Sequence, residues 1–470
     1  MPSQTVSARA VDPGDDLATA LAAIPTALGL TREFPAAVTD EAERIAAIAP
    51  LPELDRTDLE FITIDPAGST DLDQAMCLLR EGEGYRVYYA IADVPAFVEV
   101  GGAVDAEARR RGQTVYAPDG RIPLHPAVIS EGAASLLPGQ LRGAFVWDLE
   151  LHADATVVTA RVYRARVMSR TQYDYETAQA MADSGAGFDI LREVGEKREL
   201  LEQKRGGASL RVPETEVEVV DGHYVIERRS PLPVEAWNAQ LSLMTGMEAA
   251  RMMLDASVGI LRTMPDADDD AVSRFRHQAA ALGQPWPTTQ RYGDYLRGLD
   301  TTDPRQLAIM HAAASLFRGA GYSAFDGERP ENTMQAAVAA PYAHVTAPLR
   351  RLVDRFGLVL CEALSAGEPV PDWVRDALPT LPSIMNSSNS LAGQVDSRAL
   401  DAVEAAMLHD RVGAEFDATV LASGKGSSTV QLDDPAVTAK CGAQLEPGSR
   451  VRVRLVSAEI ASGTVKFSVV

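Results

Sequence analysis

Three aspartates lie close together in the segment TIDPAGSTDLDQAM, residues 63–76. Asp65 follows an apolar, β-prone run, and a proline and a glycine after it favour a turn. Such a turn can bring Asp71 and Asp73 back beside the first carboxylate. Carboxylates that share a pocket repel one another unless a cation holds them together, and hard oxygen ligands suit Mg²⁺. The segment is therefore a candidate magnesium site.

A site of this kind could perform phosphoryl transfer. Two divalent ions ~3.5–4 Å apart can activate a water and stabilise the leaving oxygen during an in-line attack. A calcium loop is one alternative, but counting from Asp65 it would need ligands where the chain has Ala67, Ser69 and Met76. That alternative fails. Ordinary turn aspartates remain an alternative on spacing alone.

The elements that must position this loop change in character along the chain. Strand-like segments bounded by turns predominate over residues 51–170, and helical composition predominates over 171–380. We expect a small helical N-terminal module, a mixed catalytic core, a connecting helix and a C-terminal barrel. Their predicted bounds are residues 1–50, 51–385, 386–410 and 411–470.

Individual elements can be predicted within these parts. Strands are expected at 60–64, 85–91 and 156–167, and long helices at 235–255 and 303–318. Two N-terminal helices are expected as well, the first interrupted by a proline. These elements predict an α+β core with the acidic loop after its first strand.

Residues 411–470 form a distinct C-terminal part. Short β-prone segments with glycine-containing connections occur there, as in an OB-fold barrel. Arg450, Arg452 and Arg454 alternate with apolar residues, which places the three arginines on one face of a strand. That face is a candidate track for nucleic-acid phosphates. An ordinary solvated strand face is the equal alternative.

The composition is that of a globular protein with an acidic surface. Apolar residues make up 46% of the 470 residues, and the formal net charge is −22. Affinity for a polyanion depends on Lys and Arg, so nucleic-acid binding would need local basic groups or a metal. Three scattered cysteines, no apolar leader and no membrane-length run predict a cytoplasmic protein without membrane attachment. We expect it to be a monomer.

The acidic segment and four later segments together resemble the RNase II (RNB) family, in the order expected for it. The later segments are YYAIADVPAFV (88–98), TVYAPDGRIPLHP with SLLPG (114–126 and 135–139), SRTQYDYETA (169–178) and YAHVTAPLRRLVDR (342–355). The resemblance implies an α+β RNB catalytic core followed by an S1-type OB barrel. A small helical module would replace the two N-terminal cold-shock barrels that the family usually carries.

The resemblance also implies roles for the acidic loop. The family's four acidic positions correspond to Asp65, Asp71, Asp73 and Gln74, which would hold Mg²⁺. Asp73 matches the aspartate that matters most for catalysis. Gln74 departs from the family, because an amide oxygen can coordinate Mg²⁺ but adds no charge for a second ion.

Arg350, Arg351 and Tyr116 would contact RNA. Thr346, followed shortly by a proline, is a helix-start signal that would place both arginines in a first helical turn. By resemblance, Arg350 is catalytic: it contacts the scissile phosphate or stabilises its developing charge. The alternative is a surface pair with Asp354 at i+4. Tyr116 matches a tyrosine that stacks on bases near the 3′ end.

The resemblance thus predicts a 3′-to-5′ hydrolytic exoribonuclease that degrades single-stranded RNA to 5′-mononucleotides with Mg²⁺. The neutral Gln74 supports a second hypothesis, a catalytically weakened RNB-type protein that binds RNA as a regulator. A metal-dependent phosphoesterase acting on small substrates is a third hypothesis, which the C-terminal barrel disfavours.

Overall fold

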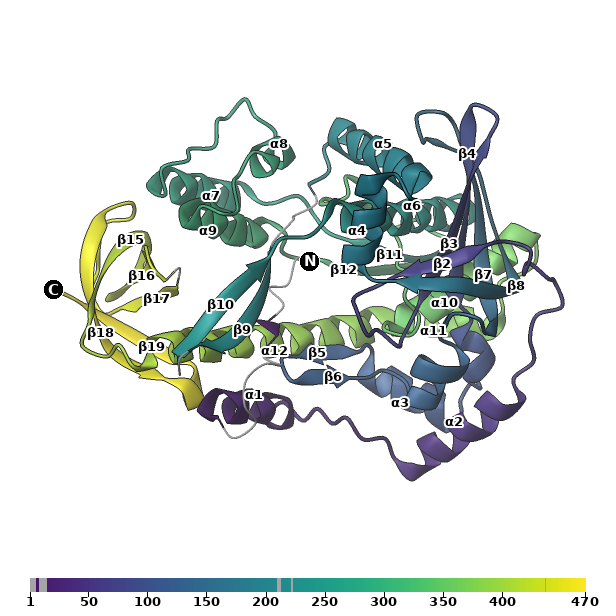
Figure 1. Ribbon diagram of the computed structural model, residues 1–470, viewed down its shortest axis with the longest axis horizontal. Helices are drawn as coiled ribbons and strands as arrows, with labels where there is room; N and C mark the ends of the chain where they lie inside the picture. The colour runs from purple at the N-terminus through teal and green to yellow at the C-terminus, as the bar shows by residue number, and fades with distance from the viewer. Residues whose placement is uncertain (1–5, 8–14, 209–212, 221–222, 436) are drawn as a thin grey trace.

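The computed structural model describes residues 6–7, 15–208, 213–220, 223–435 and 437–470 (Figure 1). One closed barrel, at the right in this view, has its strands in the order β2-β3-β4-β7-β8. All neighbouring strands are antiparallel except β2 and β8, which pair in parallel and close the barrel. The strands are β2 (Phe61–Ile64), β3 (Gln74–Glu81), β4 (Gly84–Ala92), β7 (Leu141–Leu151) and β8 (Val157–Tyr173).

Some helices pack against this barrel, others lie nearer the C-terminal part, and the long last helix runs between the two (Figure 1). They are α1 (Asp16–Ala27), α2 (Ala36–Ile48), α3 (Ala103–Arg111), α4 (Tyr175–Ser184), α5 (Asp189–Arg205), α6 (Pro233–Ala256), α7 (Asp269–Ala281), α8 (Tyr292–Arg297), α9 (Pro304–Ala313), α10 (Leu352–Ala366), α11 (Asp372–Ala377) and α12 (Leu381–His409). Short 3-10 or π turns occur at Val94–Phe97, Val128–Ala133, Ala314–Leu316 and Ile460–Ser462.

Small sheets and hairpins complete the core. The hairpin of β5 (Val115–Ala117) and β6 (Gly120–Ile122) lies beside α12 (Figure 1). The others are β1 (Val6–Ser7) with β9 (Glu214–Val220) and β10 (His223–Arg229), β11 (Val258–Thr263) with β12 (Gly321–Asp326), and β13 (Met334–Gln335) with β14 (Ala340–Pro341).

Successive side chains of a strand point to opposite faces, and the last four residues of β4 are buried on both. On β4, Val87 and Tyr89 belong to a large apolar cluster that includes residues of α6 and α10. Ala90 and Ala92 belong to another cluster that includes residues of α2. The ends of β2 and β3 are thereby fixed from both sides, and the acidic loop runs between them.

The C-terminal part is a second closed barrel, as predicted. Its strand order is β15-β16-β17-β19-β18, and Phe416, Val453 and Phe467 lie in its core. The strands are β15 (Glu415–Gly424), β16 (Ser427–Leu432), β17 (Thr438–Cys441), β18 (Arg450–Glu459) and β19 (Thr464–Val469). On β18 the apolar residues alternate with exposed arginines. The predicted period-two pattern is therefore confirmed.

Some element predictions were wrong in detail. Helix α1 continues through Pro25 to Ala27, although proline at this position removes one i→i−4 hydrogen bond. The last long helix begins at Leu381 rather than near 386. The helix expected to reach 318 ends at Ala313. Strands β11 and β12 interrupt the region predicted to be mainly helical.

No helix in the described part of the chain is both long and apolar enough to cross a membrane.

Candidate active site

The acidic loop connects β2 to β3 across one end of the first barrel. The Asp65 N–H donates to the Tyr173 carbonyl at 3.1 Å, which continues the β2–β8 pairing up to the loop. The Ser69 N–H donates to the Pro66 carbonyl at 3.1 Å, so the chain turns where the sequence predicted a turn. This turn brings Asp71 and Asp73 back toward Asp65.

Asp73 is the buried centre of the site, with 2% of its surface exposed. Its carboxylate accepts from the Leu349 N–H at 2.8 Å and from Arg350 Nε at 2.7 Å. Burial raises the pKa of Asp73 to about 6, and the Arg350 guanidinium acts in the opposite direction. A charged hydrogen bond thus joins Asp73 to Arg350, which lies 277 positions later in the chain.

Asp65 lies close enough to Asp73 and to Asp71 to interact with both electrostatically. Burial raises the pKa of Asp65 to about 7; Arg350 lowers it, and the charges of Asp73 and Asp71 raise it further. The Arg121 guanidinium contacts the Asp71 carboxylate. The structure therefore brings Asp65, Asp71, Asp73 and Arg350 into one region, and their roles as metal ligands and catalytic groups stay predictions.

Gln74 has two partners within the protein. Its amide donates to the Thr346 carbonyl at 2.5 Å, and its side-chain oxygen accepts from the Tyr89 hydroxyl at 3.0 Å. A carboxylate could not donate the first of these bonds, which gives a physical reason for the amide at this position. Its role as a metal ligand stays a prediction.

The two arginines differ in their surroundings. Arg350 leaves 40% of its side chain exposed, so part of its guanidinium is open to a ligand. Arg351 instead binds Asp354 through Nε at 2.8 Å and Nη2 at 2.7 Å. The predicted helical turn was wrong, since α10 begins at Leu352, after both arginines. The alternative pair was also wrong, because Asp354 pairs with Arg351.

Asp354 explains why the turn before α10 forms. The carboxylate is fully buried and also accepts from the Ala347 N–H at 2.7 Å. Together with the Arg351 pair, this bond fixes the backbone that presents Arg350 and the Leu349 N–H to Asp73. Contact of Arg351 with RNA stays a prediction.

Tyr116 on β5 lies beside Arg350. Its residue surface is 46% exposed, which leaves the ring available for stacking. Its hydroxyl interacts with Arg350, and burial of that end raises the Tyr116 pKa. The structure therefore places this candidate base-stacking ring next to the carboxylate and guanidinium groups.

The three predicted barrel arginines lie far from this cluster in sequence, on β18. Each is more than half exposed, and each already has a carboxylate partner. Arg450 pairs with Asp433, while Arg452 and Arg454 both pair with Glu415. These pairs reduce the net positive charge of the face, so its role in RNA binding stays a prediction.

Sequence reasoning missed several side chains that hold the site. The Tyr89 hydroxyl fixes Gln74, and the Ser242 hydroxyl lies 2.7 Å from that of Thr346. Asn238, one helical turn before Ser242, donates to the Ile64 carbonyl at 3.2 Å. The i, i+4 spacing of Asn238 and Ser242, which places both on one side of α6, was the available signal.

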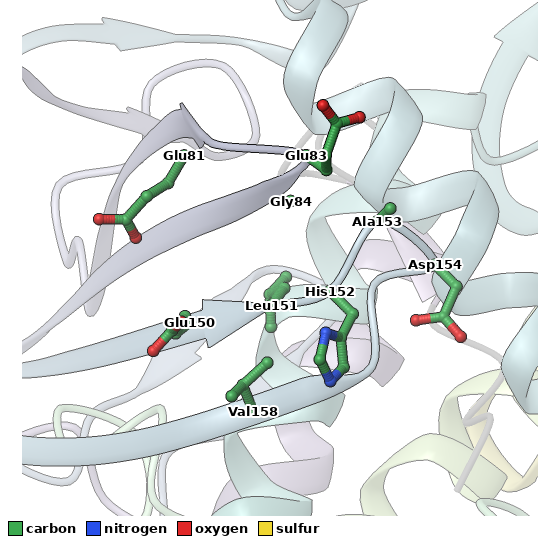
Figure 2. A pocket seen from close by; sticks show the side chains of 9 residues that line it. All are labelled: Glu81, Glu83, Gly84, Glu150, Leu151, His152, Ala153, Asp154 and Val158. Carbon is green, nitrogen blue, oxygen red and sulfur yellow. The ribbon is translucent and has the colours of Figure 1, made fainter.

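A separate pocket of about 500 Å³ opens at the β3–β4 and β7–β8 turns (Figure 2). Four carboxylates line it, from Glu81, Glu83, Glu150 and Asp154. None of the predicted site residues contributes to its wall, and its acidic lining would repel phosphate. This pocket is therefore unrelated to the predicted chemistry.

Comparison with known proteins identifies the family. The model of the RNB domain matches residues 54–360, well over half of the chain. The chain belongs to the RNB family. The model of the RNase II-type exonuclease C-terminal S1 domain matches residues 414–470, which is the second barrel. The predicted resemblance and fold class are confirmed.

Curated relatives of this RNB protein are ribonucleases. Ribonuclease R of Escherichia coli is 27% identical over 335 residues, which cover 66% of this chain and 40% of the relative. The exosome complex exonuclease dis3 of Schizosaccharomyces pombe is 29% identical over 331 residues, which cover 64% of this chain and 33% of the relative. The chain spans less than half the length of these relatives.

Solved structures share the fold of this RNB protein. Mycoplasma genitalium RNase R, in complex with ribose methylated single-stranded RNA, superposes with a TM-score of 0.82 at 18% identity, covering 97% of this chain and 78% of that one. Yeast Ssd1, described as a pseudonuclease, superposes with a TM-score of 0.67 at 16% identity, covering 87% of this chain and 54% of Ssd1. Likeness at these identities extends to the fold alone.

Proposed function

We propose that this RNB protein is a 3′-to-5′ hydrolytic exoribonuclease that degrades single-stranded RNA to 5′-mononucleotides with Mg²⁺. The observation that supports this most strongly is the bond between Asp73 and Arg350, which puts a partly exposed guanidinium beside a group of carboxylates. Phosphodiester hydrolysis needs both charges, one to hold a cation and one to bind phosphate. The curated ribonuclease relatives support the same class of substrate.

The carboxylates fit a divalent cation that is partly held by its substrate. Burial beside two other carboxylates raises the pKa of Asp65 to about 7, so about half of these groups would carry a proton at neutral pH and a bound cation would displace it. No three His, Cys, Asp or Glu side chains in the described residues lie close enough together to form a ready-made metal site. Mg²⁺ commonly uses only one or two carboxylates, with waters and substrate phosphate as its other ligands.

Asp65 and Asp71 are the ligands we propose first, with Asp73 and Gln74 completing the predicted set. A bound divalent ion would supply an activated water and offset the charge of the phosphate. The chain's own contribution is orientation. Asp73 holds Arg350 through Nε, which leaves the Nη groups to donate to the phosphate oxygens where charge develops.

The position of Tyr116 supports the exonucleolytic part of the proposal. Its exposed ring lies beside Arg350, where it would stack on a base next to the phosphate being cleaved. Stacking contributes ~1–3 kcal/mol per base and tolerates any sequence. A terminal base held beside Arg350 would favour removal of one nucleotide at a time.

The direct test is digestion of one RNA oligomer labelled at either end. With Mg²⁺, the 3′ label should appear as mononucleotide at once, while the 5′ label should pass through a ladder of shortening products. Asp73→Asn should abolish cleavage and preserve RNA binding. Asp148→Asn is a matched control, because Asp148 is also a buried aspartate, 3% exposed, and pairs with Arg86 instead. An endonucleolytic pattern, or full activity of Asp73→Asn, would reject the proposal.

A second candidate function is RNA binding without turnover. Gln74 in place of an acidic residue favours it, and the fold is shared with a pseudonuclease. An oligomer that remains intact after long incubation with Mg²⁺ or Mn²⁺, yet binds to the protein, would select this function.

A further inference from the structure

We propose that Arg121 is a positioning residue: it orients the Asp71 carboxylate for the cation and joins the acidic loop to the hairpin that carries Tyr116. The inference rests on the proposed function, since it concerns the same cation site. Sequence spacing gave no reason to select Arg121, which lies in β6, 50 positions after Asp71.

One guanidinium bridges three groups around the acidic loop. Arg121 Nη1 contacts the Asp71 carboxylate. Its Nη2 lies 2.8 Å from Glu131 Oε1 and donates to Thr70 Oγ1 at 2.9 Å. The Thr70 hydroxyl donates in turn to Glu131 Oε2 at 2.9 Å. A planar guanidinium suits this arrangement, because its donors reach several acceptors in fixed directions.

The register of the hairpin sets the direction of this contact. Val115 pairs with Ile122, and Tyr116 pairs with Arg121. Successive pairs point to opposite faces of a sheet. Val115 and Ile122 are each 3% exposed and pack with residues of α1 and α12. Tyr116 and Arg121 therefore share the other face, which is turned toward Asp71 and Arg350.

The backbone around Asp71 is already fixed, so its side chain is the part that needs orienting. The Ser135 hydroxyl donates to the Thr70 carbonyl at 2.8 Å, and the Leu72 N–H donates to Ser135 Oγ at 2.9 Å. Arg121 then holds one oxygen of Asp71 and leaves the other for a cation. Because Arg121 faces two carboxylates, Asp71 and Glu131, the group keeps a net negative charge.

The test is a calorimetric titration with Mn²⁺ in the absence of RNA, followed by cleavage of a labelled oligomer over a range of Mg²⁺ concentrations. Arg121→Gln should weaken Mn²⁺ binding by ~10–100-fold, as is typical when the partner of a metal ligand is removed. The Mg²⁺ concentration that gives half-maximal cleavage should rise by a similar factor. Arg121→Lys, which keeps the charge but not the planar donors, should recover only part of the loss.

Arg32→Gln is the matched control. Arg32 binds Asp119 at 2.6 Å at the tip of the same hairpin, and its loss should leave Mn²⁺ affinity unchanged. Glu131→Gln is a second variant, which leaves Arg121 in place and removes one of the carboxylates that hold it. It should weaken Mn²⁺ binding in the same direction but by less, and it keeps the inference testable if Arg121→Gln does not fold.

Four outcomes would overturn the inference. Unchanged or tighter Mn²⁺ binding by the folded Arg121→Gln variant would exclude positioning. Weaker RNA binding in EDTA, with Mn²⁺ affinity unchanged, would assign Arg121 to the RNA instead. If the wild-type protein cleaves RNA while Arg121→Gln has the same Mg²⁺ dependence, only the role of Arg121 fails. If the wild-type protein neither binds Mn²⁺ nor cleaves RNA, the proposed function fails with it.

Discussion

Replacing Arg350 by lysine tests whether its guanidinium acts on the reacting phosphate. Arg350 uses Nε for its bond to Asp73, at 2.7 Å, and 40% of its side chain is exposed. Lysine can pair with Asp73 and keep the positive charge. It cannot pair with Asp73 and at the same time present a second, fixed donor to phosphate. The substitution therefore separates the phosphate contact from the structural contact.

The expected effect is large on the rate and small on stability. Loss of one preorganised donor to developing charge typically costs ~10²–10³ in rate, equivalent to ~2.7–4 kcal/mol. Lysine keeps a positive charge beside the buried Asp73, so this carboxylate is not left unpaired and the loss of stability should be small. Arg351→Lys should behave in the opposite way, because Arg351 forms two bonds with the fully buried Asp354. We expect it to lower the melting temperature by several degrees and to change the rate by less than tenfold.

Single-turnover cleavage of a 5′-labelled oligomer, with enzyme in excess, measures the chemical step. The ratio of the Arg350→Lys rate to the wild-type rate at saturating enzyme gives the loss of transition-state stabilisation. A rate within threefold of wild type would refute the proposed phosphate contact. A rise in KM with kcat unchanged would assign Arg350 to ground-state binding instead.

Three further perturbations follow from the structure. Tyr116→Ala should weaken binding of a short oligomer by ~1–3 kcal/mol while Tyr116→Phe has little effect, measured by fluorescence anisotropy in EDTA, because the exposed ring would stack through its face. Burial raises the pKa of Glu404, on α12, to about 8 from an ordinary value of 4.5, so the folded state retains a proton that the unfolded state loses. Stability should therefore fall as the pH rises from about 4.5 to 8. Glu404→Gln should remove that fall in melting curves. Simultaneous replacement of Arg450, Arg452 and Arg454 by Gln should weaken the binding of a long RNA oligomer and reduce its salt dependence, but should leave the binding of a four-nucleotide RNA unchanged. Equal effects on both RNAs would exclude a phosphate track on the barrel.

The sequence was sufficient for features that depend on neighbouring residues. The turn after Asp65 follows from its proline and glycine, and the alternation on β18 follows from the period of a strand. The long α6 and the closed C-terminal barrel were predicted in the same way. Ordered motifs were sufficient for the family, which the match over 54–360 confirms.

The tertiary structure determined which charged side chains pair with one another. The first barrel closes through the parallel pairing of β2 with β8, strands about a hundred positions apart that no local pattern relates. Sequence spacing placed Arg350 and Arg351 in one helical turn, whereas the backbone before Leu352 directs Arg350 to Asp73 and Arg351 to Asp354. A charged hydrogen bond forms only where burial and backbone direction bring donor and acceptor within about 3 Å, and both are properties of the packed chain.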